Sequence, residues 1–210
     1  MSQAEIAQGW LLTARHCPSP NYDQRPSGQP PELIVIHCIS LPPGQYGAGQ
    51  VDELFCNRLD PNGHSYFAGI ADLRVSAHFL IDRHGSLTQY VSCDQRAWHA
   101  GKSQWRGRER CNDFSIGIEL EGSDSDIYTE PQYMALAELI QCLLHHYPEL
   151  RPWQLAGHDE IAPGRKTDPG PGFDWARLCG LLGVSPQQRL DSLAASTVGR
   201  SFPASRKPNP

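Results

Sequence analysis

One segment in the last third of the chain gathers residues that could bind a metal ion. It runs from Gly157 to Gly170 and holds His158, Lys166 and Asp168 among two prolines and three glycines. Proline removes a backbone donor and glycine permits sharp bends, so we expect an irregular loop and no helix here. Imidazole nitrogen and carboxylate oxygen both suit zinc, so the histidine and the aspartate could bind one ion with a third ligand from elsewhere. The alternative is a surface histidine before a polar turn.

Two segments predict the strands on which such a site would be built. The run from Leu33 to Ile39 is short, rich in β-branched residues and bounded by turn formers, as expected of a buried central strand, and His37 lies near its end. The run from Phe114 to Glu121 alternates between apolar and polar or small residues. Its side-chain period of two places Glu119 and Glu121 on the face opposite the apolar residues. That face could also be a solvated face of the sheet.

Other patterns predict the surrounding elements. Apolar residues at helical spacing predict helices over Thr129–Tyr147 and Asp174–Leu182, and shorter helices over Ser2–Arg15 and Val51–Leu59. The turn between Val75–Ile81 and Leu87–Val91 indicates a β-hairpin, with a further strand at Arg96–Ala100. Together these elements predict an α/β fold with helices packed on a sheet.

Two segments rich in proline and glycine interrupt this pattern. Pro18–Pro31 should run as an extended surface connection. Leu41–Gly69 is long and irregular around its short helix, as binding loops and lids often are, although a passive surface excursion fits equally well. After Val184 the chain is rich in Ser, Ala, Pro and Arg. We therefore expect one domain over residues 1–183 and a disordered tail over 184–210.

Composition limits the classes of function. The 210 residues suit a single domain, and a net charge of -5 argues against nucleic acid as a partner. The apolar runs are too short for a membrane span or for the core of a signal peptide. Seven cysteines without a C-x-x-C pair favour a reducing compartment, so we expect a cytoplasmic protein.

Spacing alone does not choose the third metal ligand, because the chain has nine histidines and lacks the H-E-x-x-H helical zinc motif. Six ordered motifs between about residues 9 and 178 are more informative. They resemble those of the AmpD-type 1,6-anhydro-N-acetylmuramyl-L-alanine amidases, which belong to the wider zinc amidase family with phage lysozyme-type amidases and peptidoglycan-recognition proteins. The motifs are His37–Gly44, Tyr66–Ile70, Arg74–His78, Arg96–Gly101, Arg110–Gly122 and Arg165–Gly170.

The resemblance implies a fold, a metal and a reaction. It implies one domain with a central mixed β-sheet flanked by helices, and it makes His37, His158 and Asp168 the zinc ligands. It also implies that Glu119 and Lys166 are the catalytic side chains. The reaction would be hydrolysis of the amide between (1,6-anhydro)N-acetylmuramic acid and L-alanine, in cytoplasmic cell-wall recycling that also limits β-lactamase induction.

Further residues in these motifs are candidates for binding the muropeptide. Arg74 and Arg110 could pair with carboxylates of the peptide stem, or could equally clamp loop carbonyls or a neighbouring aspartate. Trp98 and His99 are expected to line the cleft, and Tyr66 to orient the substrate or to pack there.

Two further residues of these motifs, His78 and Cys38, are not expected to bind the metal. We expect His78 to be a histidine packed in the sheet. Cys38 stands where this family usually has asparagine, and strand alternation predicts that it faces away from His37.

Two other functions remain open from the sequence. One is a peptidoglycan-fragment binding module without activity, and the other is a general zinc protease. The presence of all three ligand types and both catalytic types disfavours the first, and nothing resembles an extended peptide groove. We expect a monomer whose partner is a small-molecule muropeptide.

Overall fold

A six-stranded mixed sheet forms the centre of the computed structural model, which describes residues 5–47 and 49–194. Its four parallel strands are neighbours, β7 is antiparallel to β6, and β3 is parallel to β7 at the edge. The predicted central mixed sheet is therefore confirmed. The strands in order across the sheet are β12 (Leu155–Gly157), β5 (Leu33–Ile39), β11 (Ser115–Glu121), β6 (Phe79–Ile81), β7 (Leu87–Gln89) and β3 (Arg15–His16).

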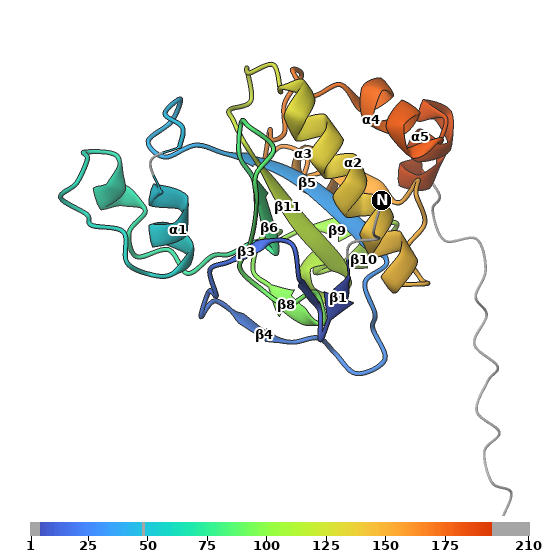
Figure 1. Ribbon diagram of the computed structural model, residues 1–210, viewed down its shortest axis with the longest axis horizontal. Coiled ribbons are helices and arrows are strands. Elements are labelled where there is room, and N and C mark those ends of the chain that lie inside the picture. Colours follow the sequence, from blue (N-terminus) through green and yellow to red (C-terminus); the bar gives the residue numbers. More distant parts are fainter. Residues whose placement is uncertain (1–4, 48, 195–210) are drawn as a thin grey trace, which may run out of the picture.

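Helix α2 (Glu130–His146) lies across one face of this sheet (Figure 1). Its first turn is held by a capping box, in which the Thr129 hydroxyl accepts from the backbone of Gln132 and the Gln132 side chain accepts from that of Thr129. Buried leucines and isoleucines of α2 pack against alternate residues of the central strands, among them Ile34, Ile118 and Phe79. This apolar layer is the main core of the domain.

The remaining helices are short. They are α1 (Gln50–Phe55), α3 (His158–Ile161), α4 (Trp175–Leu182) and α5 (Pro186–Ala194), with 3₁₀ turns at Phe67–Gly69 and Cys111–Asp113. The predicted helices over residues 51–59, 129–147 and 174–182 are confirmed with slightly different ends. Gly183 ends α4 in the left-handed conformation, with φ of 69°.

The predicted N-terminal helix is wrong. Within the described part of residues 2–15, the chain forms a hairpin of β1 (Ile6–Ala7) and β2 (Trp10–Leu11). Gln8 and Gly9 make its two-residue turn with positive φ. No residue larger than glycine fits at position 9, because a Cβ there would lie 2.1 Å from the Ser92 hydroxyl.

Two further small sheets cover the other face of the central sheet. They pair β4 (Tyr22–Gln24) with β8 (Gln95–Ala97), and β9 (Gln104–Trp105) with β10 (Arg108–Glu109). The expected surface connection at residues 18–31 thus contains a strand. Trp105 and Phe114 from this covering layer pack with Leu33 and Val35 of β5. The second face of the sheet is therefore also buried.

Two expectations about the C-terminal part are corrected. The segment expected to be irregular throughout begins with α3, because the Glu160 carboxylate accepts from the Gly157 backbone N–H at 2.7 Å and closes one helical turn. The segment expected to be disordered from residue 184 contains α5. Arg189 of α5 is buried, pairs with Glu160 and stacks over Trp175 at 3.3 Å. Residues 195–210 of the expected tail lie outside the described residues.

Candidate metal centre

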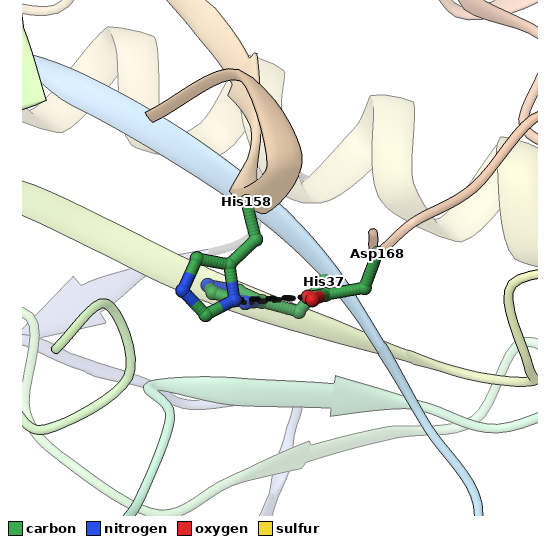
Figure 2. Close-up of side chains that lie close together, drawn as sticks. All are labelled: His37, His158 and Asp168. Carbon is green, nitrogen blue, oxygen red and sulfur yellow. Dashed lines mark hydrogen bonds and ion pairs between the residues drawn. The ribbon is translucent and has the colours of Figure 1, made fainter. Parts of the chain in front are cut away.

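Three side chains from separate elements converge at the C-terminal end of the parallel strands (Figure 2). His37 comes from β5, His158 is the first residue of α3, and Asp168 lies in the loop that follows α3. Strand β12 is parallel to β5, and α3 follows β12 directly. His37 near the end of β5 and His158 just after β12 therefore lie at the same end of the sheet. The backbone N–H of Asp159 donates to the carbonyl of Asp168 at 2.9 Å, which fixes the loop beside α3.

The three donor atoms form a nearly equilateral triangle. His37 Nδ1 and His158 Nδ1 are 3.0 Å apart, and Asp168 Oδ2 lies 3.1 Å from the first and 3.0 Å from the second. Tetrahedral zinc with bonds of about 2.0–2.1 Å places its ligand atoms roughly 3.3 Å apart. Two neutral imidazoles and one carboxylate are also the donor types of a catalytic zinc site. The site therefore fits a divalent ion such as zinc, with a small outward adjustment.

The surroundings of the two histidines decide which ring nitrogen can face the ion. Burial lowers the pKa of His37 to about 4, although the neighbouring Asp168 carboxylate opposes the shift. His158 Nε2 lies 3.2 Å from the carbonyl oxygen of Ala100, so that nitrogen carries the proton. A metal-binding histidine commonly donates its second N–H in this way, which orients the ring.

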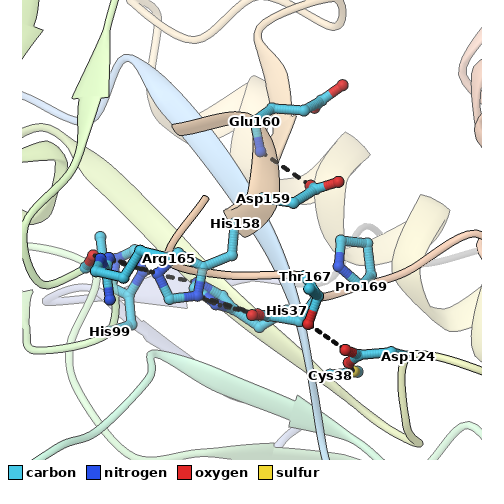
Figure 3. Close-up of polar contacts among 12 residues, drawn as sticks. His37, Cys38, His99, Asp124, His158, Asp159, Glu160, Arg165, Thr167 and Pro169 are labelled. Atoms are coloured by element: carbon cyan, nitrogen blue, oxygen red, sulfur yellow. Dashed lines mark hydrogen bonds and ion pairs between the residues drawn. The ribbon is translucent and has the colours of Figure 1, made fainter. Parts of the chain in front are cut away.

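Asp168 is ready to bind as a carboxylate. Burial alone would raise its pKa, but the imidazoles of His158 and His37 beside it hold that pKa well below the usual value. Thr167 next to it hydrogen-bonds Asp124, and Asp124 accepts from the Cys38 thiol at 3.4 Å (Figure 3). The ligand loop is thus tied back to β5 on the side away from the metal ligands.

Glu119 is the direct neighbour of His37 on the next strand. It is only 8% exposed, and its Oε2 atom is buried without a hydrogen-bond partner among the described residues. Burial raises its pKa well above the usual value, the charge of Asp168 raises it further, and Lys166 lowers it. The alternative of a solvated sheet face is therefore wrong for this carboxyl group.

A cavity of about 370 Å³ opens beside these side chains. The chain from 41 to 70 forms one wall, with Leu41, Phe55 and Ile70. Whether this segment acts as a lid stays a prediction. Eight of the predicted site residues line the cavity: His37, Tyr66, Trp98, His99, Glu119, His158, Lys166 and Asp168.

The two predicted arginines lie outside this cavity. Arg74 is exposed and donates to the carbonyls of Ala71 and Leu73, both at 3.4 Å. Arg110 pairs with Asp113 at 3.3 Å and lines a neighbouring cavity of about 500 Å³. Both clamps foreseen as alternatives are present, and a role of either residue in substrate binding stays a prediction.

The structure adds one residue that the sequence analysis did not single out. Arg165 donates to the carbonyls of Ala100 and Lys102, at 2.6 and 2.8 Å. It also lies within 3.3 Å of His158 Nε2 (Figure 3). It therefore fixes the Ala100 carbonyl that orients His158. Its place directly before Lys166 in the same motif was the available signal. His78 is fully buried outside the metal-binding triangle, as expected.

None of the described helices is long and apolar enough to span a bilayer. Nor does a disulfide join any of the seven cysteines, all of which fall in the described residues.

Residues 27–171 match the family described as N-acetylmuramoyl-L-alanine amidase. The chain is 58% identical to the 1,6-anhydro-N-acetylmuramyl-L-alanine amidase AmpD of Escherichia coli strain K12 over 173 residues, which are 82% of this chain and 94% of that protein. A crystal structure of a selenomethionine AmpD derivative is 57% identical, with a TM-score of 0.83 and coverage of 85% of this chain and 99% of that one.

A more distant relative was solved with a ligand. It is the N-acetylmuramyl-L-alanine amidase AmiD from E. coli, in complex with the substrate anhydro-N-acetylmuramic acid-L-Ala-D-γ-Glu-L-Lys. It is 31% identical, with a TM-score of 0.55, and the match covers 77% of this chain and 61% of that one. From the extent of the family match and the identity to AmpD, this chain belongs to the N-acetylmuramoyl-L-alanine amidase family.

Proposed function

We propose that the protein hydrolyses the amide between 1,6-anhydro-N-acetylmuramic acid and L-alanine in muropeptides, with zinc held by His37, His158 and Asp168. The observation that carries this proposal is the single cavity into which the three donor atoms, Glu119 and Lys166 all open. When bound there, zinc supplies Lewis acidity that lowers the pKa of a water molecule and polarises the scissile carbonyl.

Glu119 is the proposed general base and acid. It accepts a proton as the water oxygen bonds to the carbonyl carbon, and it passes that proton to the alanine nitrogen as the C–N bond breaks. A raised pKa suits both steps. It makes the carboxylate a stronger base toward water, and the carboxylic acid that forms can still give the proton to the leaving nitrogen. Its position on β11 next to His37 keeps it fixed relative to the metal ligands.

Lys166 is the proposed stabiliser of the developing negative charge. Its side chain lines the cavity two residues before Asp168, so its ammonium can approach the carbonyl oxygen of the bound amide. Loss of one such donor typically removes about 3 kcal/mol of transition-state stabilisation.

The substrate and the cellular setting follow from the relatives. Proteins more than half identical to this one carry the name 1,6-anhydro-N-acetylmuramyl-L-alanine amidase, which supports an anhydro-muropeptide as the substrate. We place the reaction in the cytoplasm, in cell-wall recycling that limits β-lactamase induction. Seven cysteines without a disulfide agree with a reducing compartment. We expect the protein to act as a monomer.

A non-catalytic binding module is the second candidate function. Against it stands Glu119, because burying its Oε2 atom without a hydrogen-bond partner costs stability, and a proton acceptor beside the metal ligands is what hydrolysis requires. A general zinc protease is the third, and hydrolysis of ordinary peptides beside muramyl peptides separates it from the proposal.

The test measures zinc content and product formation in the same samples. On a purified anhydro-muropeptide, the unmodified protein should release the intact peptide and anhydro-N-acetylmuramic acid. Asp168→Ala should lose bound zinc and activity together, whereas Glu119→Ala should keep zinc and lose turnover. Glu138→Ala, an exposed position on α2, is the control for a simple loss of charge. An active Glu119→Ala protein would remove the base assignment.

A further inference from the structure

The imidazole of His99 lies between the candidate metal ligand His37 and strand β11. His99 Nδ1 is 2.9 Å from His37 Nε2, and the two rings meet edge to face at 85°. On its other side, His99 Nε2 is 3.2 Å from the Ser115 hydroxyl. His99 was expected to line the cleft as a candidate substrate contact, yet both of its ring nitrogens face groups of the protein.

The direction of the hydrogen bonds along this chain follows from its last member. The Ser115 hydroxyl lies 2.6 Å from the carbonyl oxygen of Cys111, which can only accept, so the serine donates there. The serine oxygen then accepts from His99 Nε2–H, which leaves His99 Nδ1 with a lone pair. That lone pair accepts from His37 Nε2–H. The proton of His37 is thereby held on the nitrogen that faces away from the other ligands.

Strand β11 provides the space for the His99 ring. A Cβ at Gly117 would lie 2.4 Å from His99 Cγ and 2.5 Å from His99 Nδ1, so even alanine would displace the ring. Ser115, Gly117 and Glu119 alternate along one face of β11. The same strand face therefore supplies the acceptor for His99, the room for its ring and the buried carboxyl group.

The backbone on either side of His99 is also fixed. The side-chain oxygen of Asn112 accepts from the N–H of His99 at 3.2 Å and from the N–H of Ala100 at 2.7 Å. The Ala100 carbonyl in turn accepts from His158 Nε2. One short stretch of chain, residues 99–100, thus supplies the second hydrogen-bond partner of both candidate histidine ligands.

We propose that His99 is a positioning residue for metal binding, which holds the His37 proton on Nε2 and so leaves His37 Nδ1 free for the ion. Ser115 and Gly117 keep the His99 ring in the orientation this requires. The proposal rests on the proposed function, because it assumes that His37 binds zinc. It differs from a role in substrate contact, which predicts an effect on KM and none on zinc affinity.

The expected loss of zinc affinity follows from what is typical of residues that hydrogen-bond a metal ligand. Mutation of a residue that orients a metal ligand typically weakens metal binding by about 10–100-fold. His99→Ala should therefore raise the zinc Kd by about that factor in competition with a chelator. His99→Asn keeps an oxygen acceptor at nearly the position of Nδ1 and should restore affinity to within a few fold of the unmodified protein.

Gly117→Ala gives an independent arm, because it removes no polar atom. It should weaken zinc binding about as much as His99→Ala, because the added methyl group displaces the His99 ring from its position beside His37. The control is His84→Ala, at an exposed histidine in the hairpin turn, which should leave the zinc Kd unchanged. Circular dichroism and thermal unfolding of each variant establish that it is folded.

Nitrogen-15 NMR of the metal-free protein reports directly which ring nitrogen of His37 carries the proton. We expect Nε2 in the unmodified protein and in His99→Asn, and a mixture of the two tautomers in His99→Ala. The proposal is overturned if His37 keeps its proton on Nε2 in His99→Ala, or if neither His99→Ala nor Gly117→Ala weakens zinc binding.

These readouts separate the positioning role from the proposed activity. If zinc affinity and the His37 tautomer change as described but no muropeptide is hydrolysed, the proposed function fails and the positioning role stands. If the unmodified protein hydrolyses the muropeptide but the variants change neither the zinc affinity nor the His37 tautomer, the positioning role fails and the proposed function stands.

Discussion

The two faces of strand β11 differ in composition although both are buried. On one face, Ile116, Ile118 and Leu120 pack under α2 and are at most 1% exposed. On the other face, Ser115 and Gly117 contact His99, and Glu119 lines the cavity beside the metal ligands. A single seven-residue strand therefore supports both the main core and the candidate site.

The comparison shows where stability and chemistry are separated in this fold. Burying an isoleucine or leucine side chain typically contributes about 1.5–3 kcal/mol to folding. A buried polar group without a partner typically costs about 1–3 kcal/mol. The α2 face should therefore stabilise the domain, while the Glu119 face should lower its stability in the metal-free state.

The sharpest way to break this comparison is to neutralise the buried carboxyl group. Glu119→Gln has nearly the same shape but cannot take up the water proton. We expect kcat to fall by about 10²–10⁴-fold, the usual contribution of a general base. The zinc content should not change, since Glu119 is not one of the three ligands. Steady-state kinetics and metal analysis on the same preparation measure both.

A substitution at the neighbouring Ile118 should change stability and leave metal binding and catalysis intact. Ile118→Ala removes a fully buried side chain under α2 and should lower the free energy of unfolding by about 2–5 kcal/mol. The zinc Kd and the kcat of the folded fraction should stay near those of the unmodified protein. Urea denaturation of the metal-free protein gives the first quantity.

The control for that prediction lies on the outer side of the same helix. Met134 is 42% exposed, and Met134→Ala should change stability by no more than about 0.5 kcal/mol. If Ile118→Ala instead abolished zinc binding while remaining folded, the two faces would not be separable.

The sequence predicted the two faces of β11 but not the burial of the polar one. Alternation along the strand is a local property, so it assigned Glu119 and Ile118 to opposite sides. The layer over this face is built from loops and strands of two or three residues between residues 95 and 114, which carry no periodic pattern. Burial of that face depends on packing between distant segments, and spacing does not report it.

The errors at the two ends of the chain have related causes. Ile6, Trp10 and Leu11 have a spacing that suits a helix, but the same residues also suit a tight hairpin when Gln8 and Gly9 adopt positive φ. At the other end, α5 has a polar composition and is held by its buried Arg189, which pairs with Glu160. Long-range pairing of charged residues is invisible to a composition argument.

The metal-binding triangle came from resemblance and not from spacing. Its residues lie 121 and 131 positions from His37 along the chain, and only the parallel pairing of β12 with β5 brings them to one edge. Two-residue periodicity predicts which way His37 points, but it does not say which of nine histidines it meets.

The stability of metal-free protein should depend on pH through Glu119. Its pKa is raised in the folded state, so the unfolded chain loses this proton first as the pH rises. The stability that this group contributes is fully present below its ordinary pKa of 4.5 and is lost as the pH rises toward the folded pKa. Relative to Glu119→Gln, the unmodified protein should therefore lose up to about 1.4 kcal/mol per pH unit above that value.

Urea denaturation of both proteins between pH 4 and pH 8, with a chelator present, provides the measurement. The difference between the two free energies of unfolding should be constant at the acid end and grow toward neutral pH. A difference that is the same at every pH would show that the Glu119 carboxyl group is as easily ionised in the folded state as in the unfolded one.

The smallest expected effect is at Cys38, which follows His37 directly but belongs to the α2 face. It is the register partner of Leu120, and its thiol donates to Asp124 instead of approaching the metal ligands. Burial raises the pKa of this thiol, so it stays protonated at neutral pH and is a poor ligand. Cys38→Ala should therefore leave the zinc Kd within about twofold and lower stability by about 1 kcal/mol at most, the typical contribution of one hydrogen bond. A tenfold loss of zinc affinity, measured in the same chelator competition, would mean that the side chains at positions 37 and 38 do not act on separate faces of the sheet.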